Sequence, residues 1–222
     1  MYAGWHSGAE GSKEEQAVVF AASRQRCVLV VPALFDEGHK LRRLTLDTMR
    51  MLDASGVDCV LPDIPGLNES LATLADQTLE SWRNALTEAG RYFGANECLA
   101  IRGGALIVPE DLPTTLYAPV NGAKILRGMI RARTLAAREA GRNETADALL
   151  AAGREEGLEL AGYHLGAQLL HDLQLARAYS SNVLQTIEQS DLDGPGLWLR
   201  AEPSADMAQA QRLADLVAGT AP

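Results

Sequence analysis

The chain has 222 residues, of which 20 are Lys or Arg and 29 are Asp or Glu, so its formal net charge is −9. A hydrophobic fraction of 47% and a charged fraction of 22% are typical of a globular protein with a sizeable core. The negative charge argues against a general binder of nucleic acid or of anionic membranes, because both need a basic field. No stretch approaches the ~18 uninterrupted apolar residues of a membrane span, and no leader pattern is visible, so we expect a cytoplasmic protein.

Three cysteines, Cys27, Cys59 and Cys98, each stand at or near the start of an apolar run. Their spacing is not that of zinc ligands, and an odd number of cysteines does not make a disulfide framework. A free cysteine in such a run behaves as a small buried hydrophobe. We therefore expect buried free thiols, no metal and no cofactor.

Strands and helices alternate along most of the chain. Short apolar runs predict strands at 17–22, 27–32, 57–61, 97–101, 114–118, 182–188 and 196–201. Apolar residues at helical spacing predict helices at 41–52, 78–93, 167–179 and 205–218. This alternation predicts an α/β fold, with a mainly parallel sheet flanked by helices, in a single domain over residues 1–222.

Residues 123–157 interrupt the alternation, because helical patterns at 124–140 and 144–156 follow one another without a strand. We expect a helical insertion that lies above the sheet like a lid. Its apolar faces would suit packing on the sheet or on a second copy of the chain, so the sequence leaves a monomer and a homo-oligomer as alternatives. Arg127, Arg131 and Arg138 form a basic stripe there, incomplete because Arg133 lies on another side, and we interpret them as a solvated face.

Polar and glycine-rich segments follow three of the strands, at the edge where open parallel sheets place their chemistry. One of them reads Asp63-Ile64-Pro65-Gly66-Leu67-Asn68-Glu69-Ser70, and with this loop the chain resembles the α/β-hydrolases. In that superfamily such a loop follows an early strand, and Pro32 would begin the loop of the oxyanion hole. More narrowly, the chain resembles the α/β-hydrolase-like proteins of exosortase A systems, which accompany bacterial exopolysaccharide gene clusters. The matching positions in that group are Pro32, Asp36, Glu37, Lys40, Arg42, Arg43, residues 117–122 and residues 197–203.

The catalytic serine that this resemblance implies is missing. A hydrolase of this fold needs a G-x-S-x-G elbow. The matching segment reads Ala100-Ile101-Arg102-Gly103-Gly104, so Arg102 stands in the place of the nucleophile. Arginine offers only donors and cannot attack a carbonyl. A histidine is also expected after the last strand, and residues 202–207 contain none.

Two other arrangements could still carry chemistry. An active hydrolase or esterase with an unusual mechanism would use His39, in the oxyanion-hole loop, with Asp36 or Asp191 as the acid, but no Ser or Cys near the elbow could be its nucleophile. His164 and His171 are seven residues apart and could share a helix face. No third ligand accompanies them, so we expect no metal site.

Arg102 itself has three interpretations. It pairs with carboxylates on neighbouring loops, where Asp36, Glu37 and Glu202 are expected, and closes a vestigial pocket, or it binds a small anion such as a carboxylate, a phosphate or an acidic sugar. The third interpretation is an exposed arginine or one that binds a partner. The candidate ligand-binding residues are Phe35, Glu37, Arg102, Gly103 and Glu202. The leading hypothesis is a non-catalytic binding or accessory protein, linked to exopolysaccharide production by the resemblance alone. A purely structural homo-oligomer is the third alternative.

Overall fold

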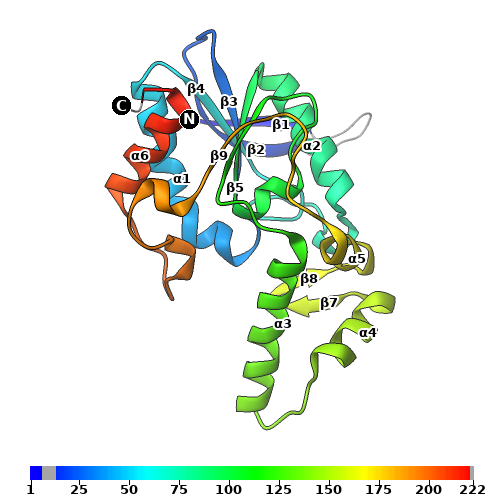
Figure 1. The fold of residues 1–222 in the computed structure, drawn as a ribbon. Coiled ribbons are helices and arrows are strands. Elements are labelled where there is room, and N and C mark those ends of the chain that lie inside the picture. The colour runs from blue at the N-terminus through cyan, green and yellow to red at the C-terminus, as the bar shows by residue number, and fades with distance from the viewer. Residues whose placement is uncertain (7–13, 221–222) are drawn as a thin grey trace.

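The computed structural model describes residues 1–6 and 14–220, and seven of its strands form one sheet in the order β1-β2-β4-β3-β5-β6-β9 (Figure 1). These strands are β1 (Tyr2–His6), β2 (Glu14–Phe20), β3 (Cys27–Val31), β4 (Asp58–Pro62), β5 (Glu97–Ile101), β6 (Thr114–Tyr117) and β9 (Val183–Ile187). The pairs β1–β2 and β2–β4 are antiparallel, whereas neighbouring strands from β4 to β9 are parallel. The predicted α/β fold with a mainly parallel sheet is therefore confirmed.

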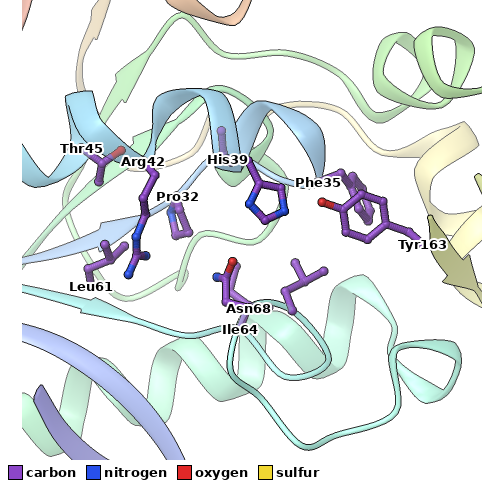
Figure 2. A pocket seen from close by; sticks show the side chains of 12 residues that line it. Pro32, Phe35, His39, Arg42, Thr45, Leu61, Ile64, Asn68 and Tyr163 are labelled. Carbon is purple, nitrogen blue, oxygen red and sulfur yellow. The ribbon is translucent and has the colours of Figure 1, made fainter. Parts of the chain in front are cut away.

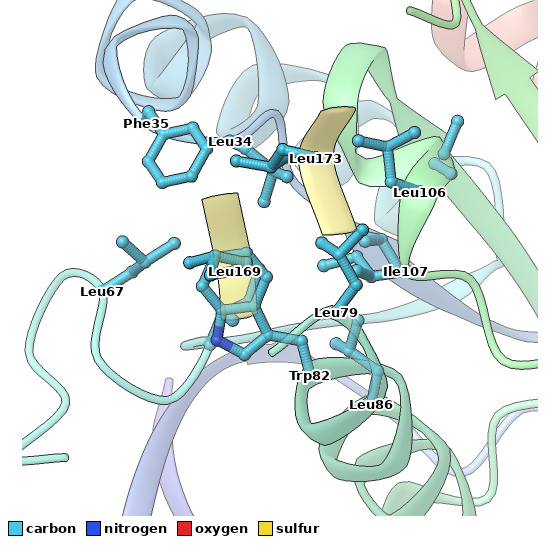
Figure 3. Packing of buried hydrophobic residues seen from close by; sticks show 14 of the residues in the cluster. Leu34, Phe35, Leu67, Leu79, Trp82, Leu86, Leu106, Ile107, Leu169 and Leu173 are labelled. Atoms are coloured by element: carbon cyan, nitrogen blue, oxygen red, sulfur yellow. The ribbon is translucent and has the colours of Figure 1, made fainter. Parts of the chain in front are cut away.

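Helices cover both faces of the sheet, and each face has its own apolar core. The helices are α1 (Asp36–Ala54), α2 (Leu79–Phe93), α3 (Gly122–Glu139), α4 (Ala146–Glu156), α5 (Ala167–Leu175) and α6 (Met207–Ala218). On one face α1 and α6 pack against each other, and α2 lies on the opposite face (Figure 1). On the α2 side, Trp82 packs with Leu34, Phe35 and Leu169 (Figure 3), and its indole N–H donates to the Pro65 carbonyl at 2.8 Å. This bond ties α2 to the loop after β4.

The strand predicted at 196–201 is wrong. The segment forms a short 3₁₀ helix, Leu197–Leu199, and among the described residues β9 is the last strand of the sheet. The reason is a tertiary contact, because the Trp198 ring folds back over Gly196 and reaches Arg102. Strand β1 was not predicted, α1 begins five residues earlier than its apolar pattern suggests, and α5 ends at Leu175.

An arm of the molecule, residues 122–175, carries α3, α4, a small hairpin and α5 between β6 and β9. The hairpin strands, β7 (Leu158–Leu160) and β8 (Tyr163–Leu165), are antiparallel and were not predicted. Figure 1 shows α3 running away from the sheet, with α4 and the hairpin beside it. The Arg133 guanidinium holds this arm together, because it donates to Glu144 at 2.7 Å and to the Glu159 carbonyl at 2.6 Å.

All three cysteines are free and buried, as their apolar settings predict. Burial raises the pKa of the Cys27 thiol to about 11, and those of Cys59 and Cys98 to about 12. Thiolates are the reactive form, so we expect an aromatic disulfide reagent to leave all three thiols unmodified at neutral pH until the protein is unfolded. Counting the released thiolate before and after denaturant tests this, and fast modification of any thiol in the native protein would contradict it.

Asp58, at the start of β4, fastens the turn before β3. Its side chain is 5% exposed and accepts hydrogen bonds from the backbone N–H groups of Ala22 and Arg24, each at 2.9 Å, and also from the Arg24 guanidinium. Burial alone would raise the pKa of this carboxyl, but these hydrogen bonds outweigh it and hold the pKa below its usual range.

Replacing this carboxylate, in Asp58→Asn, is expected to lower the free energy of unfolding by about 2 kcal/mol at neutral pH, because an amide satisfies fewer of the three donors. Since the pKa of Asp58 is lowered on folding, its stabilisation is present above the unfolded pKa of about 4 and is lost as the pH falls through the folded pKa. Melting curves between about pH 2 and about pH 6 should therefore converge for the two proteins at the acid end. A constant gap across that range would contradict this assignment.

Candidate functional site

The turn after β5 has the shape of a tight elbow. β5 passes into a 3₁₀ turn, Arg102–Leu106, and Arg102 has a φ of 52°, in the left-handed region that non-glycine residues seldom adopt. Gly104 lies so close to the end of β3 that an added Cβ would come within 2.6 Å of the Pro32 carbonyl oxygen and 2.7 Å of the Val31 carbonyl oxygen. The elbow therefore presents the Arg102 side chain at the carboxyl edge of the sheet.

Three segments of the chain hold the guanidinium of Arg102, whose side chain is 8% exposed. Its Nε and Nη2 donate to the two carboxylate oxygens of Glu37, in the first turn of α1, at 3.0 and 2.9 Å. Its Nη1 donates to the Ala118 carbonyl, after β6, at 2.8 Å. The Trp198 ring lies over the guanidinium, with its centroid 4.0 Å from Cζ. Of the five N–H groups of an arginine, these bonds use three, so one N–H on each Nη remains.

A cavity of about 520 Å³ lies over this arginine. Arg102 and Glu37 line it together with Asp36 from α1 and Lys124 from α3. The rest of its wall is mostly apolar and includes Leu34, Phe35, Val120, Ile125, Met129, Trp198 and Leu199. A cavity of this size with few polar groups has the character of a small-molecule site.

The charges around this cavity leave one cation without a partner. Glu37 pairs with Arg102, and Asp36 pairs with Lys40 at 2.8 Å. Lys124 is exposed and forms no ion pair within the described part of the chain. The balance over the cavity therefore favours a ligand with a single negative charge and an apolar body.

His39 lines a different, much smaller cavity, of about 30 Å³ (Figure 2), and Phe35 lines both cavities. It faces Asn68 there, and its ring stacks on Tyr163 at 6.4 Å between centroids. That volume suits about one water molecule. No Ser or Cys is among the residues lining this cavity, and the Thr45 hydroxyl donates to the Leu41 carbonyl.

The candidate residues for an unusual hydrolase mechanism, His39, Asp36 and Asp191, are not hydrogen-bonded to one another in the described structure. Asp36 pairs with Lys40, and Asp191 accepts the Glu188 backbone N–H at 2.8 Å in a 3₁₀ turn after β9. Glu202 is exposed and does not line the cavity over Arg102, where Trp198 from the same segment is found instead.

Gly103 packs beneath α3, where an added Cβ would come within 2.7 Å of the Ile125 side chain. His164 lies in β8 and His171 in α5. Residues 1–6 and 14–220 contain no cluster of three or more His, Cys, Asp or Glu side chains arranged to hold a metal. In the same residues no helix is long and apolar enough to cross a membrane.

No protein-family model matches this chain, and no curated protein matches its sequence. Solved structures do resemble it. A candidate hydrolase from Agrobacterium vitis S4 has a TM-score of 0.53 and 13% identity, covering 99% of this chain and 98% of that one. Est1E from Butyrivibrio proteoclasticus, solved with ferulic acid, has a TM-score of 0.52 and 14% identity over 78% and 71% of the two chains. The α/β hydrolase GrgF from Penicillium sp. sh18 has a TM-score of 0.50.

The chain has an α/β-hydrolase fold. In this fold the residue at the elbow after β5 is the nucleophile, and here that residue is a hydrogen-bonded arginine. Lys124 and Trp198 of the cavity were missed by the sequence analysis. Lys124 lies in the segment interpreted as a lid and Trp198 in a predicted strand, and neither pattern shows that the two side chains meet at one cavity.

Proposed function

We propose that this α/β-hydrolase-fold protein is a non-hydrolytic binding protein, and that the cavity over Arg102 takes a small molecule with an apolar body and one carboxylate. The observation that carries the proposal is the state of Arg102 at the elbow. The guanidinium is bound by Glu37 and by the Ala118 carbonyl, and it keeps two N–H groups for a ligand. Because the nucleophile's position holds a hydrogen-bond donor, there is no hydroxyl at the elbow to attack a carbonyl and form an acyl-enzyme.

Several features support a carboxylate with an apolar body over other anions. Most of the cavity wall is apolar, and a strongly hydrated sugar or phosphate would have to lose its water without replacement bonds. Lys124 supplies the unpaired positive charge. Est1E was solved with ferulic acid, an aromatic carboxylate, and this makes ferulate a natural first probe. A role beside exopolysaccharide machinery remains part of the proposal, supported only by the segments quoted from the sequence.

Thermal melting with four small molecules tests the proposal. Ferulate and octanoate are expected to raise the Tm, whereas methyl ferulate, which has the same body without the charge, and glucuronate, which has the charge without the body, are not. Arg102→Gln should lose the effect, and Arg91→Gln, an exposed arginine of α2, should keep it. Equal stabilisation by methyl ferulate, or by every anion, would overturn the proposed ligand class.

Arg102→Ser restores a serine at the elbow and tests the absence of hydrolysis. We expect no release of nitrophenol from short nitrophenyl esters above the buffer rate, in the wild-type protein or in this variant, because no described histidine lies in the cavity to act as a base. Saturable turnover by the wild-type protein that His39→Ala abolishes would instead establish the alternative, a hydrolase of unusual mechanism.

A further inference from the structure

Positive charge is concentrated in one segment of an acidic protein. Residues 122–142, which include all of α3, hold six Lys or Arg and one Glu, a net charge of +5. The whole chain has a net charge of −9, so the remaining residues together carry −14. This segment and the rest of the chain therefore have opposite signs, which the total charge conceals. The remainder of the arm, residues 143–175, holds six Asp or Glu and one Arg, so the positive charge belongs to the segment of α3 and not to the whole arm.

Four of these cations share one exposed face of α3. Lys124, Arg127, Arg131 and Arg138 are separated by three, four and seven residues, spacings that place them in a row along a helix of about 1.5 Å rise per residue. The opposite face of α3 is the buried one. The row, named here the basic stripe, is about 21 Å long.

The basic stripe is not neutralised by the rest of the described structure. None of its four side chains forms an ion pair with any residue in 1–6 or 14–220. Arg133, on another side of α3, is by contrast paired with Glu144. Like charges one turn apart on a helix repel, so the stripe is unfavourable in isolation and favours contact with something anionic.

An open hollow of about 560 Å³ lies at the far end of the stripe. Arg131, Arg138 and Arg142 line it, together with Thr134, Asn143 and Glu144. Arg142 pairs with Glu144 at 3.5 Å and the Thr134 hydroxyl donates to the Arg131 carbonyl, so the guanidinium groups of Arg131 and Arg138 and the Asn143 amide are the donors that remain at the hollow. This set of donors suits a phosphate group. Leu135 also lines the hollow and is 56% exposed, so an apolar side chain stands among the cations.

We infer that the basic stripe docks this protein on an anionic lipid surface, with headgroup phosphates at Arg131 and Arg138 and with Leu135 at the headgroup–acyl boundary. Cations beside an exposed apolar side chain are what such an interface binds. Figure 1 shows α3 projecting from the sheet, so the second half of the stripe, with Arg131 and Arg138, lies away from the strands. Nucleic acid offers the phosphates but no apolar layer for Leu135.

Co-sedimentation of the full chain with lipid vesicles tests this inference. The wild-type protein should sediment with phosphatidylcholine vesicles that contain phosphatidylserine, but not with pure phosphatidylcholine, and high salt should release it. Each cation contributes about fivefold to partitioning, so Arg131→Gln/Arg138→Gln should weaken it by about 25-fold. Leu135→Ser should weaken it a few-fold.

The matched control removes two other exposed arginines, Arg154 of α4 and Arg177, and keeps the same total charge as the stripe variant. Arg154→Gln/Arg177→Gln should sediment like the wild-type protein, and circular dichroism should show that all variants are folded. An equal loss in the control would overturn the inference, since binding would then depend on total charge. So would a wild-type protein that stays in the supernatant, or one that binds duplex DNA but not vesicles.

Discussion

Arg102→Leu is expected to lower the free energy of unfolding by about 2 kcal/mol and to abolish stabilisation by ferulate. The variant leaves the Glu37 carboxylate and the Ala118 carbonyl without their donor, and it removes the cation beneath Trp198. Glu37 is 27% exposed and regains some water, which keeps the cost below that of a fully buried pair. Denaturant unfolding of wild type and variant measures this change.

A double variant separates the pair from the surrounding packing. Glu37→Leu/Arg102→Leu removes the stranded carboxylate as well, so it should be more stable than Arg102→Leu alone. The single variant Glu37→Leu completes the comparison. If the double variant loses as much unfolding free energy as Arg102→Leu and Glu37→Leu together, the ion pair contributes no coupling and Arg102 acts only through its packing.

Gly104→Ala should destabilise the fold more than Arg102→Leu, lowering the free energy of unfolding by about 3 kcal/mol. The new Cβ would press on the carbonyl oxygens of Pro32 and Val31, which belong to backbone and cannot turn aside as a flexible side chain would. Since that contact sets the distance between the elbow and the loop after β3, the cavity over Arg102 should also change shape. Thermal melting and ferulate binding report the two effects separately.

Gly128→Ala is the control for the effect on stability alone, because Gly128 also lines the cavity over Arg102. Gly128 lies on the exposed side of α3, and an added Cβ there meets nothing within 4 Å. The change should leave stability unaltered or raise it by up to about 1 kcal/mol, because alanine favours a helix interior. Comparable destabilisation by both alanines would mean that the tight contact at Gly104 is not the cause.

The central strands β3 and β5 could be predicted because they are almost entirely apolar, CVLVV and ECLAI. β5 was predicted over 97–101 and is observed over the same residues, so Arg102 was correctly placed at the start of the turn after this strand. Asp36, Glu37 and Glu202 were expected on loops near Arg102, and of these three Glu37 pairs with it, whereas Asp36 pairs with Lys40 and Glu202 is exposed. Such features depend on local pattern and on the order of the strands.

Features set by distant contacts could not be predicted in this way. Trp198 stands in a run that reads as a strand, and only its contact with Arg102 explains the 3₁₀ turn. Arg133 made the stripe on α3 look incomplete, but its pairing with Glu144 removes it from the count of unpaired charges. Side-chain pairing across the arm therefore determines which cations remain available, and composition carries no information on that pairing.

Calorimetric titration of ferulate into the wild-type protein and into Arg102→Gln tests the central claim most directly. We expect saturable binding of one ferulate per chain, without release of any product, and an affinity at least tenfold weaker in the variant, because the ligand loses its charged donor. Equal affinity in the two proteins would contradict a site built on Arg102. Absence of binding to both proteins would contradict the proposed ligand class.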